Sequence, residues 1–484
     1  TPMAVDSSPP FPFFASKSLN IAMLLEKNER DEEMDEENDI DVKTAIVPVP
    51  SVLPRIIRLP DVSEANSRHC FVFLEDMLMF YAARFFVGYD LLEARAFRIT
   101  RDADLYIDEE DAQDLVVEVE RQLKKRQRGQ AVRLEFEVGT SRFMRRFMTQ
   151  EMNLEKEDMY QIDGPLDMTV FFGFCGIKGY DHLRYPEAHP HSPWSMLDLK
   201  RTPETNIFDM IREKDLLIHL PYESFDESVV NFLYSADKDV LAIKQTLYRV
   251  SSSSPVVQAL EKAVQNGKQV TVLMEVKARF DEANNILMAR RLEKAGAHVI
   301  YGLVGLKTHS KCTLVIRREK DGIRRYVHVA TGNYNASTAK LYTDLGILTC
   351  SDRFGIDASA FFNLLSGYSD PPIWDSFIVA PINLRQRCIE LIDREIHFAK
   401  NGEDAHMIAK MNSLLDKGII EKLYEASQAG VKIELIVRGI CVLIPGIPGV
   451  SDNITVRSIV GRFLEHSRIF WFRNGGREEL YVSS

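Results

Sequence analysis

Hydrophobic residues follow two different patterns along this chain, and the change falls near residue 200. Beyond it, short apolar runs alternate with segments in which apolar residues recur at helical spacing, a pattern typical of buried strands and amphipathic helices. The predicted strands are 240–249, 270–276, 298–301, 313–316, 327–330 and 431–437; the predicted helices are 255–266, 283–295, 385–399 and 414–429. This alternation predicts an α/β fold with a mainly parallel or mixed sheet.

The residues before position 200 mix strands and helices less regularly. Residues 19–25 and 45–58 flank a strongly acidic run at 28–42, and we expect them to be strands that pair around it, the second broken by prolines. The acidic run itself is typical of a solvated loop. Further strands are predicted at 96–100 and 132–137, and helices at 71–86 and 110–128.

One arrangement occurs twice in the second part. A predicted strand is followed by a basic residue, Arg279 in the first copy and Arg438 in the second, and then by a His-Ser-basic segment. The first segment begins at His309, 30 residues after Arg279 (309 minus 279), and the second at His466, 28 residues after Arg438 (466 minus 438). Because α/β sheets bind ligands at the carboxyl ends of their strands, both basic residues stand at a favourable place. Two facing half-sites of this kind would surround two imidazoles with cations, which suits a phosphoryl group in transfer.

Composition and charge indicate how many domains the chain has and exclude some kinds of binding partner. A chain of 484 residues with 45% hydrophobic residues predicts about three domains with packed cores. A formal net charge of −11 argues against general nucleic-acid binding, since affinity for a polyanion depends on Lys and Arg.

The six cysteines form no Cys-x-x-Cys pair, which favours a reducing cytoplasm over a disulfide framework or a structural zinc site. No segment has the length of a membrane span or the pattern of a signal peptide, so we expect at most a peripheral association with membranes.

Side chains, and not a glycine-rich loop, are expected to bind and transfer phosphate in this protein. The chain lacks the Walker A motif and the His-Arg-Asp and Asp-Phe-Gly motifs of protein kinases, so cations and a nucleophile have to replace a glycine-rich cradle. Imidazole is largely neutral near pH 7 and therefore nucleophilic, and cations beside it would lower its pKa and offset charge on the transferred group. A long anionic substrate needs a positively lined path. The candidates for that path are Lys277, Lys307, Lys311, Arg324, Arg325 and Arg468.

Two families share parts of this pattern. The His-x-basic segments, with residues 330–335 after the first, resemble elements of the phospholipase D superfamily, although position 316, where that superfamily has an Asp, is Ile316. A closer resemblance, to the histidine-phosphorylated polyphosphate kinases, covers nearly the whole chain. The segments that carry it are 55–60, 71–76, 98–105, 164–167, 244–250, 277–285, 305–311, 330–335, 341–344, 437–440 and 463–468.

The resemblance to polyphosphate kinases implies a role for each candidate residue. His309 is implied to be the nucleophile that takes the γ-phosphate of ATP as a phosphohistidine and passes it, reversibly, to the end of an inorganic polyphosphate chain. His466 is implied to assist the transfer. The substrate-binding positions are implied to be Tyr342, Arg438, His466, Lys311 and Arg468.

The resemblance also implies a magnesium site and an assembly. Arg249 and Arg279 match positions that the family associates with Mg²⁺. A guanidinium has no lone pair for a metal, so we expect these residues to clamp the phosphates that carry the ion. The substrates are expected to be ATP or ADP and polyphosphate, and the protein a homo-oligomer.

The expected domain organisation is threefold. The resemblance implies an α+β head domain at 1–195 and two related, phospholipase D-like α/β domains at 196–376 and 377–484, the second incomplete relative to the family. Two alternatives stay open. One is a phospholipase D-like phosphodiesterase, and the other is a truncated, non-catalytic paralogue that binds polyphosphate or forms oligomers.

Overall fold

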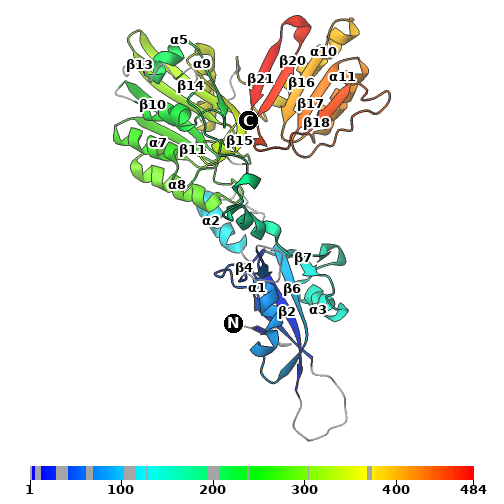
Figure 1. Ribbon diagram of the computed structural model, residues 1–484. Coiled ribbons are helices and arrows are strands. Elements are labelled where there is room, and N and C mark those ends of the chain that lie inside the picture. The colour runs from blue at the N-terminus through cyan, green and yellow to red at the C-terminus, as the bar shows by residue number, and fades with distance from the viewer. Residues whose placement is uncertain are drawn as a thin grey trace. The chain divides into compact units, whose positions relative to one another are not determined.

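The chain divides into two compact units, 1–107 with 120–184, and 108–119 with 185–484 (Figure 1). The computed structural model describes residues 3–5, 12–28, 42–60, 69–102, 115–126, 129–193, 196, 206–236, 239–303, 305–367 and 373–484. Most of the predicted acidic loop, 29–41, therefore lies outside the described residues. The division of the second unit into domains at 196–376 and 377–484 stays a prediction.

The first unit is built on a mixed sheet in the order β1-β3-β2-β6-β7-β8. Its strands are β1 (Met3–Val5), β2 (Leu19–Lys27), β3 (Val42–Pro48), β6 (Tyr89–Arg101), β7 (Ala131–Glu137) and β8 (Met159–Ile162). Strands β2 and β3 run antiparallel, with Ile21 opposite Val47. The predicted pairing around the acidic run is therefore confirmed for residues 45–48, whereas 56–58 of the predicted strand pair with 71–73 instead. Helix α3 (Arg142–Met152) buries Met144 and Met148 against this sheet.

The predicted helix over 71–86 is only partly correct. Its first residues form strand β5 (Phe71–Phe73), which pairs antiparallel with β4 (Ile56–Arg58), and helix α1 (Leu74–Phe80) follows. The amide of Leu74 donates to the carbonyl of Arg55, so the strand pairing sets where the helix begins. Helix α2 (Leu115–Arg126) falls within the predicted range 110–128 and contributes residues to both units.

The second unit contains two sheets (Figure 1), and five strands of the first follow the same order as the five strands of the second. The first runs β12-β11-β10-β13-β14-β15-β19, where β19 is Leu464–Glu465, and the second runs β18-β17-β16-β20-β21. The first sheet consists of β9 (Leu216–Leu220), β10 (Val240–Leu247), β11 (Gln269–Met274), β12 (His298–Ile300), β13 (Cys312–Glu319), β14 (Gly322–Ala330) and β15 (Tyr342–Thr349), with β9 on β15. The second consists of β16 (His406–Met411), β17 (Lys432–Val437), β18 (Ile454–Arg457), β20 (Arg468–Phe472) and β21 (Glu479–Ser483).

Pairing directions repeat as well as order. In the first sheet β12, β11 and β10 are parallel and β13 and β14 follow antiparallel; β18, β17, β16, β20 and β21 repeat these directions. The helices are α5 (Ile207–Glu213), α6 (Asn231–Tyr234), α7 (Pro255–Gln265), α8 (Glu282–Ala295), α9 (Asp352–Leu365), α10 (Leu384–Lys400) and α11 (Lys417–Gln428). The α/β prediction is therefore confirmed.

Side-chain caps explain where the corresponding helices α7 and α11 begin. Each begins after a side chain that accepts a hydrogen bond from a first-turn amide: Ser254 from Val257, and Asp416 from Ile419. Pro255 then fits the first helical position, where an amide hydrogen is not needed. Both helices connect parallel strands, as crossover connections require.

A short strand links the two sheets. Strand β19 (Leu464–Glu465) precedes β20 in the chain but pairs in parallel with β15 of the first sheet, Tyr342 opposite Leu464 and Thr343 opposite Glu465. The amides of His466 and Ser467 continue this contact by donating to the Thr343 carbonyl. The segment that carries the second histidine is thus fixed to the first sheet.

The six cysteines are free thiols, as expected from their spacing. Among the described residues, no helix combines the length and apolar character needed to span a bilayer.

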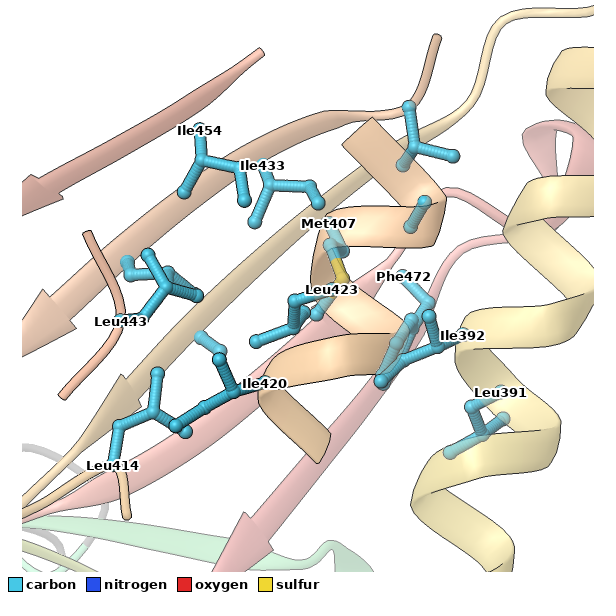
Figure 2. Packing of buried hydrophobic residues seen from close by; sticks show 14 of the residues in the cluster. Leu391, Ile392, Met407, Leu414, Ile420, Leu423, Ile433, Leu443, Ile454 and Phe472 are labelled. Atoms are coloured by element: carbon cyan, nitrogen blue, oxygen red, sulfur yellow. The ribbon is translucent and has the colours of Figure 1, made fainter. Parts of the chain in front are cut away.

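The second sheet has its own hydrophobic core, in which Figure 2 shows side chains from β17, α11 and α10 packed together. Ile433 is fully buried there. We expect Ile433→Ala to lower the free energy of unfolding by about 2 to 5 kcal/mol, because the deletion leaves a cavity, and Ile433→Val by only about 1 kcal/mol. Denaturant unfolding measures both. Equal losses in the two variants would contradict a tightly packed core at this position.

Candidate active site

The two predicted half-sites come together in the second unit. His309 lies three residues before β13 and His466 two residues before β20, so the histidines occupy equivalent places in the repeated fold. Burial lowers the pKa of His309 to about 3, and the positive charges of Lys311, Arg468, His466 and Arg249 act in the same direction. Three basic side chains, Lys311, Arg468 and Arg249, therefore lie close enough to this imidazole to act on its charge.

His309 is held on three sides. Its Nδ1 lies 2.9 Å from the amine of Lys311, and its ring meets the ring of Tyr248 edge-on, with centroids 4.7 Å apart. Its carbonyl accepts hydrogen bonds from the Lys311 amine and, at 3.2 Å, from the hydroxyl of Ser484. Within the described part of the chain, Nε2 has no hydrogen-bond partner. Nε2 is therefore the ring nitrogen that is open to a substrate.

His466 is held by a carboxylate. Its Nδ1 lies 2.8 Å from Oδ1 of Asp344, and the same oxygen accepts a hydrogen bond from the hydroxyl of Thr331 at 2.5 Å. All three residues are buried. Burial lowers the pKa of His466, whereas Asp344 opposes that shift. The carboxylate therefore fixes the ring and places the Nδ1 hydrogen toward itself, which leaves Nε2 for a substrate.

A glycine makes room for this carboxylate. A Cβ atom on Gly332 would lie 2.5 Å from Oδ2 of Asp344, far inside van der Waals contact. Gly332 belongs to the segment 330–335 that follows strand β14. The segment thus supplies both Thr331, which bonds to Asp344, and the space that Asp344 occupies.

The basic residue of each His-x-basic segment bonds back to its own histidine. Lys311 is buried and donates to the carbonyl of His309; Arg468 donates to the carbonyl of His466 at 2.6 Å. Burial lowers the pKa of the Lys311 amine well below its ordinary value, and Arg468 contributes to the shift. Each basic side chain is thus held beside an imidazole by a hydrogen bond to the carbonyl of the histidine two residues before it.

The other predicted arginines lie around this pair. Arg249 forms an ion pair with Asp281 at 3.2 Å and donates to the carbonyl of Arg279. The charge of Arg438 acts on Arg468 and lowers its pKa, although burial is the larger cause. Arg438, Arg249 and Arg468 therefore belong to one positively charged region.

Tyr342 stands next to the second histidine. Its ring centroid lies 5.1 Å from that of His466. It is the first residue of β15 and faces Leu464 of β19, so the strand pairing holds both rings together. This place beside an imidazole suits the predicted contact with a nucleotide.

Two corresponding strands, β10 and β16, each place one polar side chain against a histidine segment, and the two side chains differ in type. The hydroxyl of Thr246 on β10 donates to the carbonyl of Ser310 and accepts from the amide of Cys312. Lys410 on β16 bonds to the hydroxyl of Ser467 and, at 2.6 Å, to the carboxylate of Glu465. Both histidine segments therefore rest on a buried or half-buried polar side chain.

Four of the predicted path residues make other contacts or are exposed to solvent. Lys277 donates to the carbonyls of Leu303 and Leu306. Arg324 pairs with Asp321 at the β13–β14 hairpin, and Arg325 lies opposite Ile316, several residues along β14 from the histidines. Lys307 is exposed. Among these six candidates, Lys311 and Arg468 donate to the carbonyls of the two histidines, and a wider phosphate path stays a prediction.

Sequence reasoning missed Asp344, Thr331 and Tyr248 as site residues. All three lie within segments that carry the family resemblance, 341–344, 330–335 and 244–250. Asp344 follows the first histidine segment in the chain, but its carboxylate contacts the second histidine, His466, which is 122 residues away. A pattern of closely spaced residues therefore does not reveal it. The pairing of β15 with β19 creates that contact, and local spacing gives no sign of it.

No preformed metal cage was found in the described part of the chain: no group of three or more His, Cys, Asp or Glu side chains there is arranged to hold an ion. Arg249 and Arg279 offer only donors. The residues present therefore fit a Mg²⁺ ion carried by substrate phosphates, which is a common way for proteins to bind Mg²⁺.

Comparisons with known proteins agree with this geometry. The sequence matches three family descriptions: the polyphosphate kinase middle domain over residues 1–174, C-terminal domain 1 over 206–371 and C-terminal domain 2 over 377–484. It is 52% identical to the polyphosphate kinase of Halalkalibacterium halodurans and 50% identical to that of Bacillus cereus, with all of this chain aligned to 67% and 68% of theirs. The chain belongs to the polyphosphate kinase family.

A solved polyphosphate kinase extends the agreement to three dimensions. The crystal structure of the enzyme from Porphyromonas gingivalis is similar to this chain with a TM-score of 0.82 and 31% identity, covering 100% of this chain and 69% of the other. Membership of the polyphosphate kinase family identifies the chain as a phosphotransferase. The chain spans about two thirds of the length of the curated relatives named above.

The contact between Asp344 and His466 has a measurable consequence. Because the carboxylate favours the protonated imidazole, Asp344→Asn is expected to lower the pKa of His466 further. Titration followed by NMR of the histidine ring measures the shift. Asp321→Asn, which removes an exposed carboxylate paired with Arg324, is the control and should leave the His466 titration unchanged. An unaltered His466 pKa in Asp344→Asn would contradict this contact between the carboxylate and the imidazole.

The space at Gly332 gives a second test. Gly332→Ala is expected to push Asp344 out of place and to slow phosphoryl transfer on the order of 100-fold, the cost of misplacing a catalytic group by about 1 Å. Gly461→Ala is the matched control, because no atom lies within 4 Å of the position that its new Cβ would take. Transfer rates from ATP compare the two. Equal rates would show that Asp344 tolerates displacement.

Proposed function

We propose that this chain transfers the γ-phosphate of ATP to the end of an inorganic polyphosphate chain through a phosphohistidine at His309, and that it makes ATP from ADP and polyphosphate in reverse. The observation that carries the proposal is an uncharged imidazole with one open nitrogen, held among Lys311, Arg468 and Arg249. A neutral nucleophile within fixed positive charge is what attack on a phosphoryl group requires.

The reaction has two transfers at the same phosphorus atom. In the first, a ring nitrogen of His309 attacks the γ-phosphorus, and the bond to the bridging oxygen breaks with its electron pair leaving on ADP. In the second, a terminal oxygen of polyphosphate attacks the phosphohistidine, and the electron pair of the N–P bond returns to the ring. The low pKa of His309 keeps the ring unprotonated at neutral pH, so both steps begin and end with a usable nucleophile.

His466 is proposed to assist both transfers. Asp344 holds its Nδ1, so Nε2 can exchange a proton with the phosphoryl group or hydrogen-bond to it. General acid–base assistance of this kind is worth about 10²–10⁴-fold in rate. The charge of His466 acts on His309, which supports a place for both rings at one phosphoryl group.

The cations are proposed to bind the substrates. Arg468 and Lys311 would stabilise charge on the oxygens of the transferred group, and donors of this kind contribute about 10²–10³-fold. Tyr342 would pack on the base and Arg438 would pair with nucleotide phosphate. Arg249 and Arg279 would clamp the phosphates that carry Mg²⁺, with Asp281 as the adjoining carboxylate. Bound Mg²⁺ would neutralise phosphate charge.

The setting of the enzyme is part of the proposal. We place it in the cytoplasm, in accord with six free thiols, and as a homo-oligomer, which rests on the resemblance to the family alone.

Labelling with γ-³²P-ATP and Mg²⁺ tests the nucleophile. The wild-type protein should gain acid-labile, alkali-stable label, and His309→Ala should gain none, because the attacking nitrogen is gone. His466→Ala should be labelled about 10²–10⁴-fold more slowly.

The fate of the label separates the alternatives. Chase with polyphosphate should lengthen the chain by labelled phosphate. Release of the label to water alone would favour a hydrolase of the phospholipase D kind. Equal labelling of wild type and His309→Ala would refute the assignment of the nucleophile, and polyphosphate binding without any labelling would favour a non-catalytic role.

A further inference from the structure

Glu275 and Arg438 stand at equivalent positions, each at the carboxyl end of a strand. The amide of Glu275, directly after β11, donates to the carbonyl of Leu247, the last residue of β10. The amide of Arg438, directly after β17, donates to the carbonyl of Met411, the last residue of β16. The same place in the repeated fold therefore carries a carboxylate in the first copy and a guanidinium in the second.

The carboxylate of Glu275 is directed at the backbone next to His309. Glu275 is fully buried. Its Oε1 accepts the amide of Lys277 at 2.8 Å, and its Oε2 accepts the amide of Thr308 at 2.6 Å. Burial raises the pKa of this carboxyl, and the two hydrogen bonds act against that shift. Because Thr308 directly precedes His309, the carboxylate fixes the backbone that carries the first histidine.

The backbone in front of His309 has no regular secondary structure to fix it. Among the described residues, neither a helix nor a strand lies between β12 and β13. Gly302 and Gly305 both have a φ of 69°, a conformation that favours glycine. The amine of Lys277 donates to two carbonyls of this segment. A Cβ atom on Gly302 would lie 3.8 Å from both carboxylate oxygens of Glu275, so the segment lies directly against that side chain.

We propose that Glu275 is a positioning residue for phosphoryl transfer, which holds Thr308 and thereby sets the place of the His309 ring. This inference rests on the proposed phosphohistidine. Arg438, its equivalent in the second copy, is proposed to pair with nucleotide phosphate. One strand position would thus place the nucleophile in the first copy and bind substrate in the second.

The two contacts of Glu275 need a carboxylate. An ionised carboxylate only accepts hydrogen bonds, so each of its oxygens can take one amide hydrogen. A glutamine of the same size has one accepting oxygen and an NH₂ group, which would face the second amide donor to donor. Glu275→Gln therefore removes one of the two hydrogen bonds with almost no change in volume.

Labelling kinetics with γ-³²P-ATP test the proposed role. Glu275→Gln should lower the maximal rate of His309 labelling on the order of 100-fold, the cost of misplacing a reacting group by about 1 Å. The ATP concentration that gives half of the maximal rate should stay unchanged, because the carboxylate contacts backbone amides. An unchanged maximal rate would overturn the inference. A raised half-maximal concentration at an unchanged rate would also overturn it, since that result would assign Glu275 to substrate binding.

Glu395 provides a matched control. It is also fully buried, and its two oxygens accept the amides of His406 at 3.3 Å and Asn474 at 2.8 Å. His406 is the first residue of β16, at the opposite end of that strand from Arg438. Glu395→Gln should therefore lower the unfolding temperature, as Glu275→Gln should, but keep the wild-type labelling rate. Equal losses of labelling in the two variants would show that Glu275 contributes to stability alone.

Hydrogen exchange tests the contact without any reaction. In the wild-type protein the Thr308 amide should exchange slowly, although it lies outside the helices and strands, and Glu275→Gln should speed its exchange. Exchange of this amide at the rate of an unprotected peptide would overturn the inference even if the variant did not fold. Absence of label from folded wild-type protein would instead refute the proposed function.

Discussion

The parallel pairing of β15 with β19 fixes the register on which the whole site depends. Tyr342 faces Leu464 and Thr343 faces Glu465, so the next residues along each strand, Asp344 and His466, meet at hydrogen-bond distance. A shift by one residue would turn Asp344 away, since side chains alternate between the faces of a sheet. Two pairs of backbone partners thus align a carboxylate from one half with an imidazole from the other.

The register is protected by polar contacts around it. Thr343 accepts the amides of His466 and Ser467, and its hydroxyl donates to Glu465 at 3.0 Å. Glu465 in turn pairs with Lys410 of the second sheet. These contacts join β15, β19 and β16 through groups of low exposure, where hydrogen bonds are stronger than in water. The second histidine therefore takes its position from both sheets.

Much of this arrangement is predictable from the sequence, and the limits have a physical cause. The helices over 255–266 and 283–295 and the strands that flank them are found nearly as predicted, because helical and strand periodicities are local. The His-x-basic segments are also local, and their placement at equivalent points of a repeated fold follows from their spacing. Asp344 and the loss of residues 71–73 from a helix are different, because each depends on a strand partner distant in the chain.

The repeated topology carries a consequence for the history of the site. Five strands of the first sheet match the five strands of the second in order and direction, and duplication of an ancestral gene segment is the simplest explanation of this repeat. Such an ancestor could have assembled a symmetrical site from two identical chains, each contributing one histidine. Fusion into a single chain releases the two copies from being identical. Thr246 beside the first histidine segment and Lys410 beside the second show that the two copies have diverged, and under the proposed function this divergence lets one imidazole bond to phosphorus while the other moves protons.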